Sequence, residues 1–185
     1  MHLYPGKQIL EISTKSTQDL GASLSAFNME VVTEGKKLNL ECAFQGSKKF
    51  ENGGPFVDIY DMQPWEAKKD SRLKENGDLI QFVFGGEEFC NEPKDLFYNW
   101  IYINALREMP EKLNQLGQYE AFTDIEFNPK KSINCQAKAV AIACGLIKAG
   151  MFDESMKDSK HFLKVVYHQN AFEEYEQMSL FSLDI

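Results

Sequence analysis

ECAFQGSKKF, residues 41–50, places three polar side chains of different kinds along one line of a predicted helix. Glu41, Gln45 and Lys48 follow an i, i+4, i+7 spacing, which brings an acid, an amide and an amine onto one face. A stripe of apolar or small residues beside them would face a core: Leu40, Ala43, Phe44 and Ser47. Two interpretations follow, an exposed face with a weak Glu41–Gln45 contact or one wall of a functional site.

The composition is typical of one well-packed globular domain over residues 1–185, with 43% hydrophobic and 26% charged residues. No apolar run approaches the ~18 residues of a membrane-spanning helix. The opening residues MHLYPGKQILEIS lack the apolar stretch of a secretory signal. We therefore expect a cytoplasmic protein with no membrane partner.

Cysteine and histidine usage predicts neither a metal site nor a serine-type triad. The four cysteines lack CxxC spacing and are expected to be free, mostly buried thiols: Cys42, Cys90, Cys135 and Cys144. Only three histidines are present, and they are poorly placed for zinc: His2, His161 and His168. We expect no metal and no cofactor.

The net charge of −8 argues against binding nucleic acid through overall charge. Residues 153–185 hold seven acids and three lysines, a net of −4, which leaves −4 for residues 1–152. Four lysine pairs lie in that longer part: Lys36-Lys37, Lys48-Lys49, Lys68-Lys69 and Lys130-Lys131. Convergence of two or three pairs would make one face locally basic, and otherwise each pair is ordinary solvated surface.

Strand signals dominate the first half of the chain. Strands are expected at residues 7–13, 29–33, 36–40 and 78–84, the middle two as a hairpin around Glu34-Gly35. A helix is expected to start at Ser16 as its N-cap, with Asp19 at the third position. The NGGPF run at 52–56 ends the 41–50 helix, and residues 57–75 carry no clear pattern.

The second half reads as helix. Helical patterns cover residues 94–108, restart after Pro110, and are most apolar at 135–150, where Gly150 is a C-cap candidate. The last residues add amphipathic helix, with 166–185 as a C-terminal helical extension. The expected class is α+β, a single helix-rich domain with a small β element.

The polar segment YEAFTDIEFNPKKSINCQAKA, residues 119–139, precedes that apolar helix. A helix N-terminus offers unpaired N–H groups and favours an anion, and Lys130 and Lys131 add positive charge just upstream. This arrangement suits a phosphate or pyrophosphate. The alternative is that Ser132 or Asn134 simply caps the helix.

Several of these segments together resemble the NADAR family, also called YbiA-like. LSAFN (24–28), EGKKL (34–38) and ECAFQGSKKF (41–50) look like its opening, and Glu41, Gln45, Lys48 and Phe50 fit its Glu-x-x-x-Gln-x-x-Lys-x-Phe pattern. FYNWIYINAL (97–106) and FTDIEFNPKKSINCQA (122–137) look like the branch found beside DarT-type DNA ADP-ribosyltransferase toxins, where it serves as antitoxin. The resemblance is strongest over residues 7–165.

The chain also departs from the general family pattern. Cys42 stands where many relatives have histidine, and Asn134-Cys135-Gln136 stands where others have asparagine, leucine and glycine. Thr123-Asp124 occupies the region of a missing Trp-Gly motif. These differences favour the DarT-associated branch. They count against assigning the substrate of the YbiA-like proteins to this chain.

The resemblance implies hydrolysis of N-glycosidic bonds of ribose, including ADP-ribose attached to guanine. Such cleavage builds oxocarbenium charge, which a carboxylate stabilises while activating water, and Glu41 is the candidate. Lys48 would polarise the leaving base or a ribose oxygen, or attack a ring-opened sugar to form a Schiff base. Asp124 would be a second carboxylate that positions ribose hydroxyls or exchanges a proton.

Lys130, Lys131 and the helix N-terminus would hold the pyrophosphate. Phe27, Trp65 or Trp100 would stack on a base, the alternative for each aromatic ring being burial in the core. The full set of expected substrate-binding residues is Phe27, Asn28, Gln45, Asn128, Lys130, Lys131, Asn134 and Trp100.

The sequence thus predicts a metal-independent glycohydrolase that removes ADP-ribose from guanine in DNA and neutralises a DarT-type toxin. One alternative is a YbiA-like N-glycosidase acting on phosphorylated riboflavin-pathway intermediates. Another is a binding-only immunity protein that caps ADP-ribose or the toxin. The Glu41 and Lys48 pair favours an enzyme over the third reading.

Overall fold

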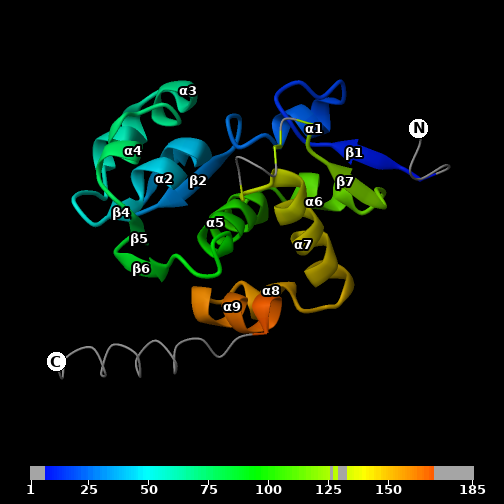
Figure 1. Cartoon of the computed structure of the whole chain (residues 1–185). Coiled ribbons are helices and arrows are strands. Elements are labelled where there is room, and N and C mark those ends of the chain that lie inside the picture. The colour runs from blue at the N-terminus through cyan, green and yellow to red at the C-terminus, as the bar shows by residue number, and fades with distance from the viewer. Residues whose placement is uncertain (1–6, 126, 129–132, 169–185) are drawn as a thin grey trace. The chain divides into compact units, whose positions relative to one another are not determined.

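The computed structural model describes residues 7–125, 127–128 and 133–168 (Figure 1). The chain divides into two compact units, residues 1–144 and 145–185. Helices and small sheets together confirm the α+β class. The expectation of a single domain over residues 1–185 stays a prediction.

Three small sheets form among the described residues of the first unit. Their strands are β1 (Ile9–Glu11) with β7 (Ala121–Thr123), β2 (Glu30–Thr33) with β3 (Lys36–Asn39), and β4 (Lys48–Phe50) with β5 (Leu79–Phe84) and β6 (Glu87–Cys90). The β2–β3 hairpin confirms the turn expected at Glu34 and Gly35, whose φ angles of 49° and 76° are those of a two-residue turn with both centres left-handed. β1 and β7 pair in parallel, which places segments from opposite ends of this unit side by side (Figure 1).

Helix α5 (Leu96–Arg107) is the central helix of the first unit and confirms the helix expected at 94–108. It packs against α2 (Leu40–Gly46), β2, β6 and α6 (Pro110–Leu116). Phe97 is fully buried, and its ring centroid lies 4.5 Å from that of Phe82 and 4.9 Å from that of Phe89. These aromatic contacts hold α5 against the β4–β5–β6 sheet.

Short helices fill the stretch that the sequence left unassigned. They are the 3-10 helix η1 (Val57–Asp61), α3 (Pro64–Ala67) and α4 (Arg72–Glu75). Nη2 of Arg72 lies 2.7 Å from a carboxylate oxygen of both Asp58 and Asp70, which ties η1 to α4. Single-turn helices carry no detectable apolar period, so their pattern was not readable.

Two predicted helix boundaries are wrong. The helix expected at 41–50 ends at Gly46, whose carbonyl accepts the N–H of Phe56 at 2.8 Å, and residues 48–50 pair with β5 as strand β4. Ser16 caps a turn rather than a helix, since its Oγ accepts the N–H of Gln18 at 3.3 Å. Helix α1 (Asp19–Ser23) begins after that turn.

Helix α7 (Gln136–Lys148) crosses the boundary between the units, and α8 (Phe152–Ser155) and α9 (Ser159–Tyr167) follow in the second. Gly150 confirms the expected cap after α7: its φ is 68°, its N–H donates to Ile147 at 3.0 Å, and that of Met151 donates to Leu146 at 2.9 Å. Of the predicted extension at 166–185, residues 169–185 lie outside the described part of the chain. Within the described part, no helix is long and apolar enough to cross a bilayer.

Candidate active site

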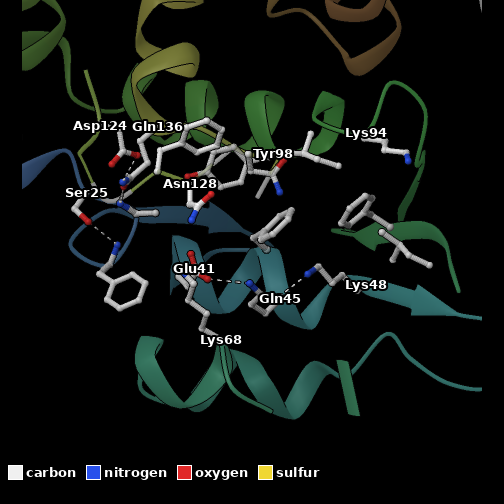
Figure 2. Close-up of a pocket in the computed structure, with 18 of the residues that line it drawn as sticks. Ser25, Glu41, Gln45, Lys48, Lys68, Lys94, Tyr98, Asp124, Asn128 and Gln136 are labelled. Carbon is white, nitrogen blue, oxygen red and sulfur yellow. Dashed lines mark hydrogen bonds between the residues drawn. The ribbon is translucent and has the colours of Figure 1, made fainter. Parts of the chain in front are cut away.

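A cavity of about 1000 Å³ opens in the first unit and is lined by residues from several distant segments (Figure 2). Its walls come from the loop at 25–27, from α2 and β4, from the end of α3, and from the segments that follow β6 and β7. The row predicted at 41–50 lines one wall, and the residues that follow β7 line another.

The acid, amide and amine expected in a row do form one (Figure 2). Nε2 of Gln45 donates to Oε1 of Glu41 at 2.8 Å, and Nζ of Lys48 donates to Oε1 of Gln45 at 2.7 Å. Glu41 is 5% exposed and Gln45 is 6% exposed. Asn39 fixes the start of this row, because its side-chain oxygen caps α2 by accepting the N–H of Glu41 at 3.0 Å.

Lys48 is half-buried, and its Nζ lies 4.7 Å from the centroid of the Phe44 ring. Burial lowers the pKa of Lys48 from 10.5 to about 8. The charge of Glu41 acts against this shift, and the charge of Lys68 adds to it. Lys48 is therefore mainly an ammonium at neutral pH with an accessible neutral form.

Of the three lysine pairs within the described residues, two each contribute one lysine to the cavity, Lys48 and Lys68. Lys68 follows α3, and its Nζ lies 5.5 Å from the centroid of Phe27, which also lines the cavity. The neighbours Lys49 and Lys69 do not line it. Partial convergence of the pairs is thus observed, while Lys130 and Lys131 lie outside the described residues.

Asp124 lies at the cavity directly after β7. Its Oδ2 accepts from Nε2 of Gln136 at 3.2 Å, and Oε1 of Gln136 accepts the N–H of Ala26 at 2.6 Å. Gln136 is the first residue of α7, so the helix start expected to bind an anion contributes a side chain that joins two parts of the wall. Asn128 and Asn134 also line the cavity, and their expected contact with substrate stays a prediction.

Three predicted substrate contacts lie elsewhere. Asn28 is exposed and donates from Nδ2 to the carbonyl of Ala22 at 2.9 Å, outside the cavity. Trp65 is 56% exposed on α3 and does not line the cavity. Trp100 lines a second hollow of about 200 Å³, because it lies about 200° around α5 from the cavity-lining Tyr98.

Sequence reasoning missed Tyr98, Lys68 and Gln136 as site residues. Tyr98 is 4% exposed, and burial raises its pKa well above 10, with the charges of Glu41 and Asp124 adding to the rise. It is therefore a neutral phenol and a hydrogen-bond donor. Its place within the apolar run FYNWIYINAL concealed it, and the polar tip of the tyrosine was the available signal.

Metal ligands do not gather in the described residues: no group of three or more histidine, cysteine, aspartate or glutamate side chains is placed to hold an ion. None of the four cysteines, all of which lie in the described residues, forms a disulfide. Cys42, next to Glu41, donates from Sγ to the carbonyl of Met62 at 3.1 Å, and burial raises its pKa to about 11. This neutral thiol packs α2 against the segment that leads into α3.

The family model for DarT1-associated NADAR antitoxins matches residues 1–176. The chain belongs to this family. That match confirms the resemblance read from the segments at 24–28, 34–38 and 41–50, and the name of the family implies a DarT toxin as the functional partner. No curated protein matches the chain.

In this NADAR antitoxin the residues of the Glu-x-x-x-Gln-x-x-Lys-x-Phe pattern lie on two different elements, α2 and β4. Lys48 lies on a strand and Glu41 on a helix, yet the Gln45 side chain connects them. The arrangement offers a buried carboxylate, an amine that is able to give up a proton near neutral pH, and a second carboxylate at Asp124. Many enzymes that hydrolyse a bond at an anomeric carbon use a pair of carboxylates, and a group that gives up a proton near neutral pH is suited to general acid catalysis.

Proposed function

We propose that this protein is a glycohydrolase that cleaves the N-glycosidic bond between ADP-ribose and guanine in DNA, and so neutralises a DarT-type toxin in the cytoplasm. The observation that carries this proposal is the buried Glu41 carboxylate, bonded through Gln45 to Lys48 on the wall of the cavity. A volume of about 1000 Å³ is at the upper end of the range for ligand pockets, about 300–1000 Å³, and suits a dinucleotide-sized group.

In the proposed reaction, water attacks the anomeric carbon of the ribose as the bond to the guanine nitrogen breaks. Glu41 accepts one proton from that water and stabilises the positive charge that develops on the sugar ring. The leaving guanine nitrogen takes a proton from the Lys48 ammonium, and exchange with solvent then resets both groups, since Lys48 takes up one proton and Glu41 releases one. Asp124 would orient ribose hydroxyls. A Schiff base between neutral Lys48 and the ring-opened sugar is the alternative route.

Turnover of a defined substrate tests this proposal. The purified protein is incubated with DNA carrying ADP-ribosylated guanine, and free ADP-ribose and unmodified guanine are quantified by mass spectrometry. Stoichiometric release of both, over many turnovers, is the expected result.

Two other outcomes would overturn the proposal. Tight binding of the modified DNA with no release would leave a binding-only immunity protein. Turnover of phosphorylated riboflavin-pathway intermediates alone would make the protein a YbiA-like N-glycosidase.

A further inference from the structure

Both polar ends of the Gln45 side chain are engaged inside the protein. Its amide nitrogen donates to Glu41 at 2.8 Å, and its amide oxygen accepts from Lys48 at 2.7 Å. With the residue only 6% exposed, little of the amide faces the cavity. This geometry differs from the substrate-binding role that the sequence suggested.

We propose that Gln45 is a positioning residue that separates Glu41 from Lys48 and orients both, without itself contacting the sugar or the base. The catalytic part of this inference rests on the proposed function. The structural part is that the Gln45 amide sets the electrostatic environment of Lys48, and this can be measured without turnover.

An amide suits this place because its two ends differ. Only the NH₂ end satisfies a carboxylate, and only the oxygen satisfies an ammonium, so the order acid, amide, amine fixes the orientation of Gln45. An amide also neither takes up nor releases a proton near neutral pH. A direct contact between Glu41 and Lys48 would form a buried ion pair, which stabilises the charged form of each and suppresses proton transfer to substrate.

Lys48 experiences charges from outside α2 as well. Among the described residues, the other charged side chains that line the same cavity are Glu41, Lys68, Asp78, Glu92, Lys94 and Asp124. Of these, Glu41 and Lys68 act on the pKa of Lys48 in opposite directions, and burial is the largest cause of its decrease. The state of Lys48 is therefore sensitive to a charge placed at position 45.

Two variants test the role of Gln45. Gln45→Glu replaces the amide with a carboxylate of nearly the same shape beside the ammonium. Gln45→Met keeps the length of the side chain but removes both hydrogen bonds. If the buried charge of Gln45→Glu prevents folding, Gln45→Met alone tests the role of Gln45.

Gln81→Glu is the matched control. Gln81 likewise donates from its amide to a carboxylate, that of Glu88 at 3.0 Å, and it pairs with Lys49 on the neighbouring strand. It does not line the cavity, so it tests the same charge change outside the site.

The first readout is the titration midpoint of the Lys48 amine, followed by NMR of lysine-labelled protein with Lys48→Arg to assign the signal. We expect Gln45→Glu to raise the midpoint by about one pH unit or more, Gln45→Met to lower it, and Gln81→Glu to leave it unchanged. The second readout is the pH–rate profile, whose alkaline limb should move in the same directions.

Midpoints that stay at the wild-type value in both folded Gln45 variants would overturn the inference, whatever happens to turnover. So would a Gln45→Met protein that binds ADP-ribose more weakly with its Lys48 midpoint unchanged, because that result indicates direct contact with substrate. If the wild-type protein has no glycohydrolase activity but the Lys48 midpoint shifts in the Gln45 variants, the role of Gln45 is upheld and the proposed function is refuted.

Discussion

Nε2 of Gln136 lies 3.2 Å from Oδ2 of Asp124 and joins the first residue of α7 to the end of β7. Because the same amide accepts the backbone N–H of Ala26, one side chain connects three segments of the cavity wall. Gln136 therefore helps to orient Asp124, although it lies outside the Glu-x-x-x-Gln-x-x-Lys-x-Phe pattern.

Gln136→Met should lower turnover about tenfold, because hydrogen bonds to a carboxylate and to a buried backbone group are both lost. The melting temperature should fall by about 2–4 °C for each kcal/mol lost, because the N–H of the buried Ala26 loses its partner. Steady-state kinetics on ADP-ribosylated DNA, beside the exposed-site control Gln115→Met, measures the effect. Equal rates in the two variants would show that Asp124 needs no such support.

Glu41→Gln keeps the size of the side chain and removes its charge. We expect hydrolysis to fall about 100-fold or more, in line with loss of a catalytic base and charge stabiliser. Glu111→Gln, on the exposed start of α6, is the matched control. Near-normal turnover by a folded Glu41→Gln protein contradicts the assignment of Glu41.

Lys68→Ala should weaken the affinity for free ADP-ribose about threefold to tenfold, because an exposed ammonium beside the cavity attracts the pyrophosphate at a screened distance. Lys69→Ala makes the same charge change one residue away, outside the cavity, and should bind normally. Calorimetry compares the two, with ribose 5-phosphate as a weaker ligand. The double variant Lys130→Ala/Lys131→Ala, also expected to bind more weakly, tests the sequence prediction for the residues outside the described chain. Equal affinities of the Lys68 and Lys69 variants would remove Lys68 from the site.

The stability of the protein should depend on pH through Lys48. Its pKa is about 8 in the folded protein and 10.5 when unperturbed, so between these values the unfolded chain binds more protons and stability rises with pH. Below pH 8, Lys48 is charged in both the folded and the unfolded protein, and the folded state carries the full free-energy cost of burying that charge.

Lys48→Met removes this dependence. Its free energy of unfolding relative to the wild type should therefore decrease between pH 8 and 10.5, by on the order of 2 kcal/mol. Urea denaturation across that range measures it, with Lys49→Met as control. A difference that stays constant with pH would show that Lys48 titrates normally in the folded protein.

Hydrolysis should continue unchanged after dialysis against EDTA, because the groups proposed to act are a carboxylate and an amine rather than a bound ion. Rates before and after chelation, measured on the same preparation, provide the check. Loss of activity that magnesium or zinc restores would mean that the site has been misassigned.

The sequence was most informative where structure is local. The Glu34-Gly35 hairpin and the Gly150 cap were readable because each depends on a backbone turn that neighbouring residues specify. Strand β6 pairs with β5 across the Gly85-Gly86 turn and was missed because its Glu87-Glu88 start is unfavourable for a strand. Strands β4 and β7 were not readable, since each is only three residues long and exists through pairing with a distant partner. The same limit explains the wrong end of the 41–50 helix.

The site divides in the same way. Spacing alone predicted the Glu41–Gln45–Lys48 row, and the row forms although Lys48 lies on a strand, because side chains this long span the change of backbone direction. Tyr98 and Lys68 had no signal from residue spacing, because Tyr98 lies in an apolar helix and Lys68 lies in a lysine pair that looks like ordinary surface.

The amino-acid sequence by itself determined the family, the α+β class and the order of acid, amide and amine, since these depend on residue types at fixed short spacings. Only the tertiary structure decided which walls meet around the cavity, that Trp100 faces away from it, and that Gln136 connects Asp124 to the loop at 25–27. Those contacts join residues far apart in the chain, and their energies depend on burial and distance, which residue spacing does not encode.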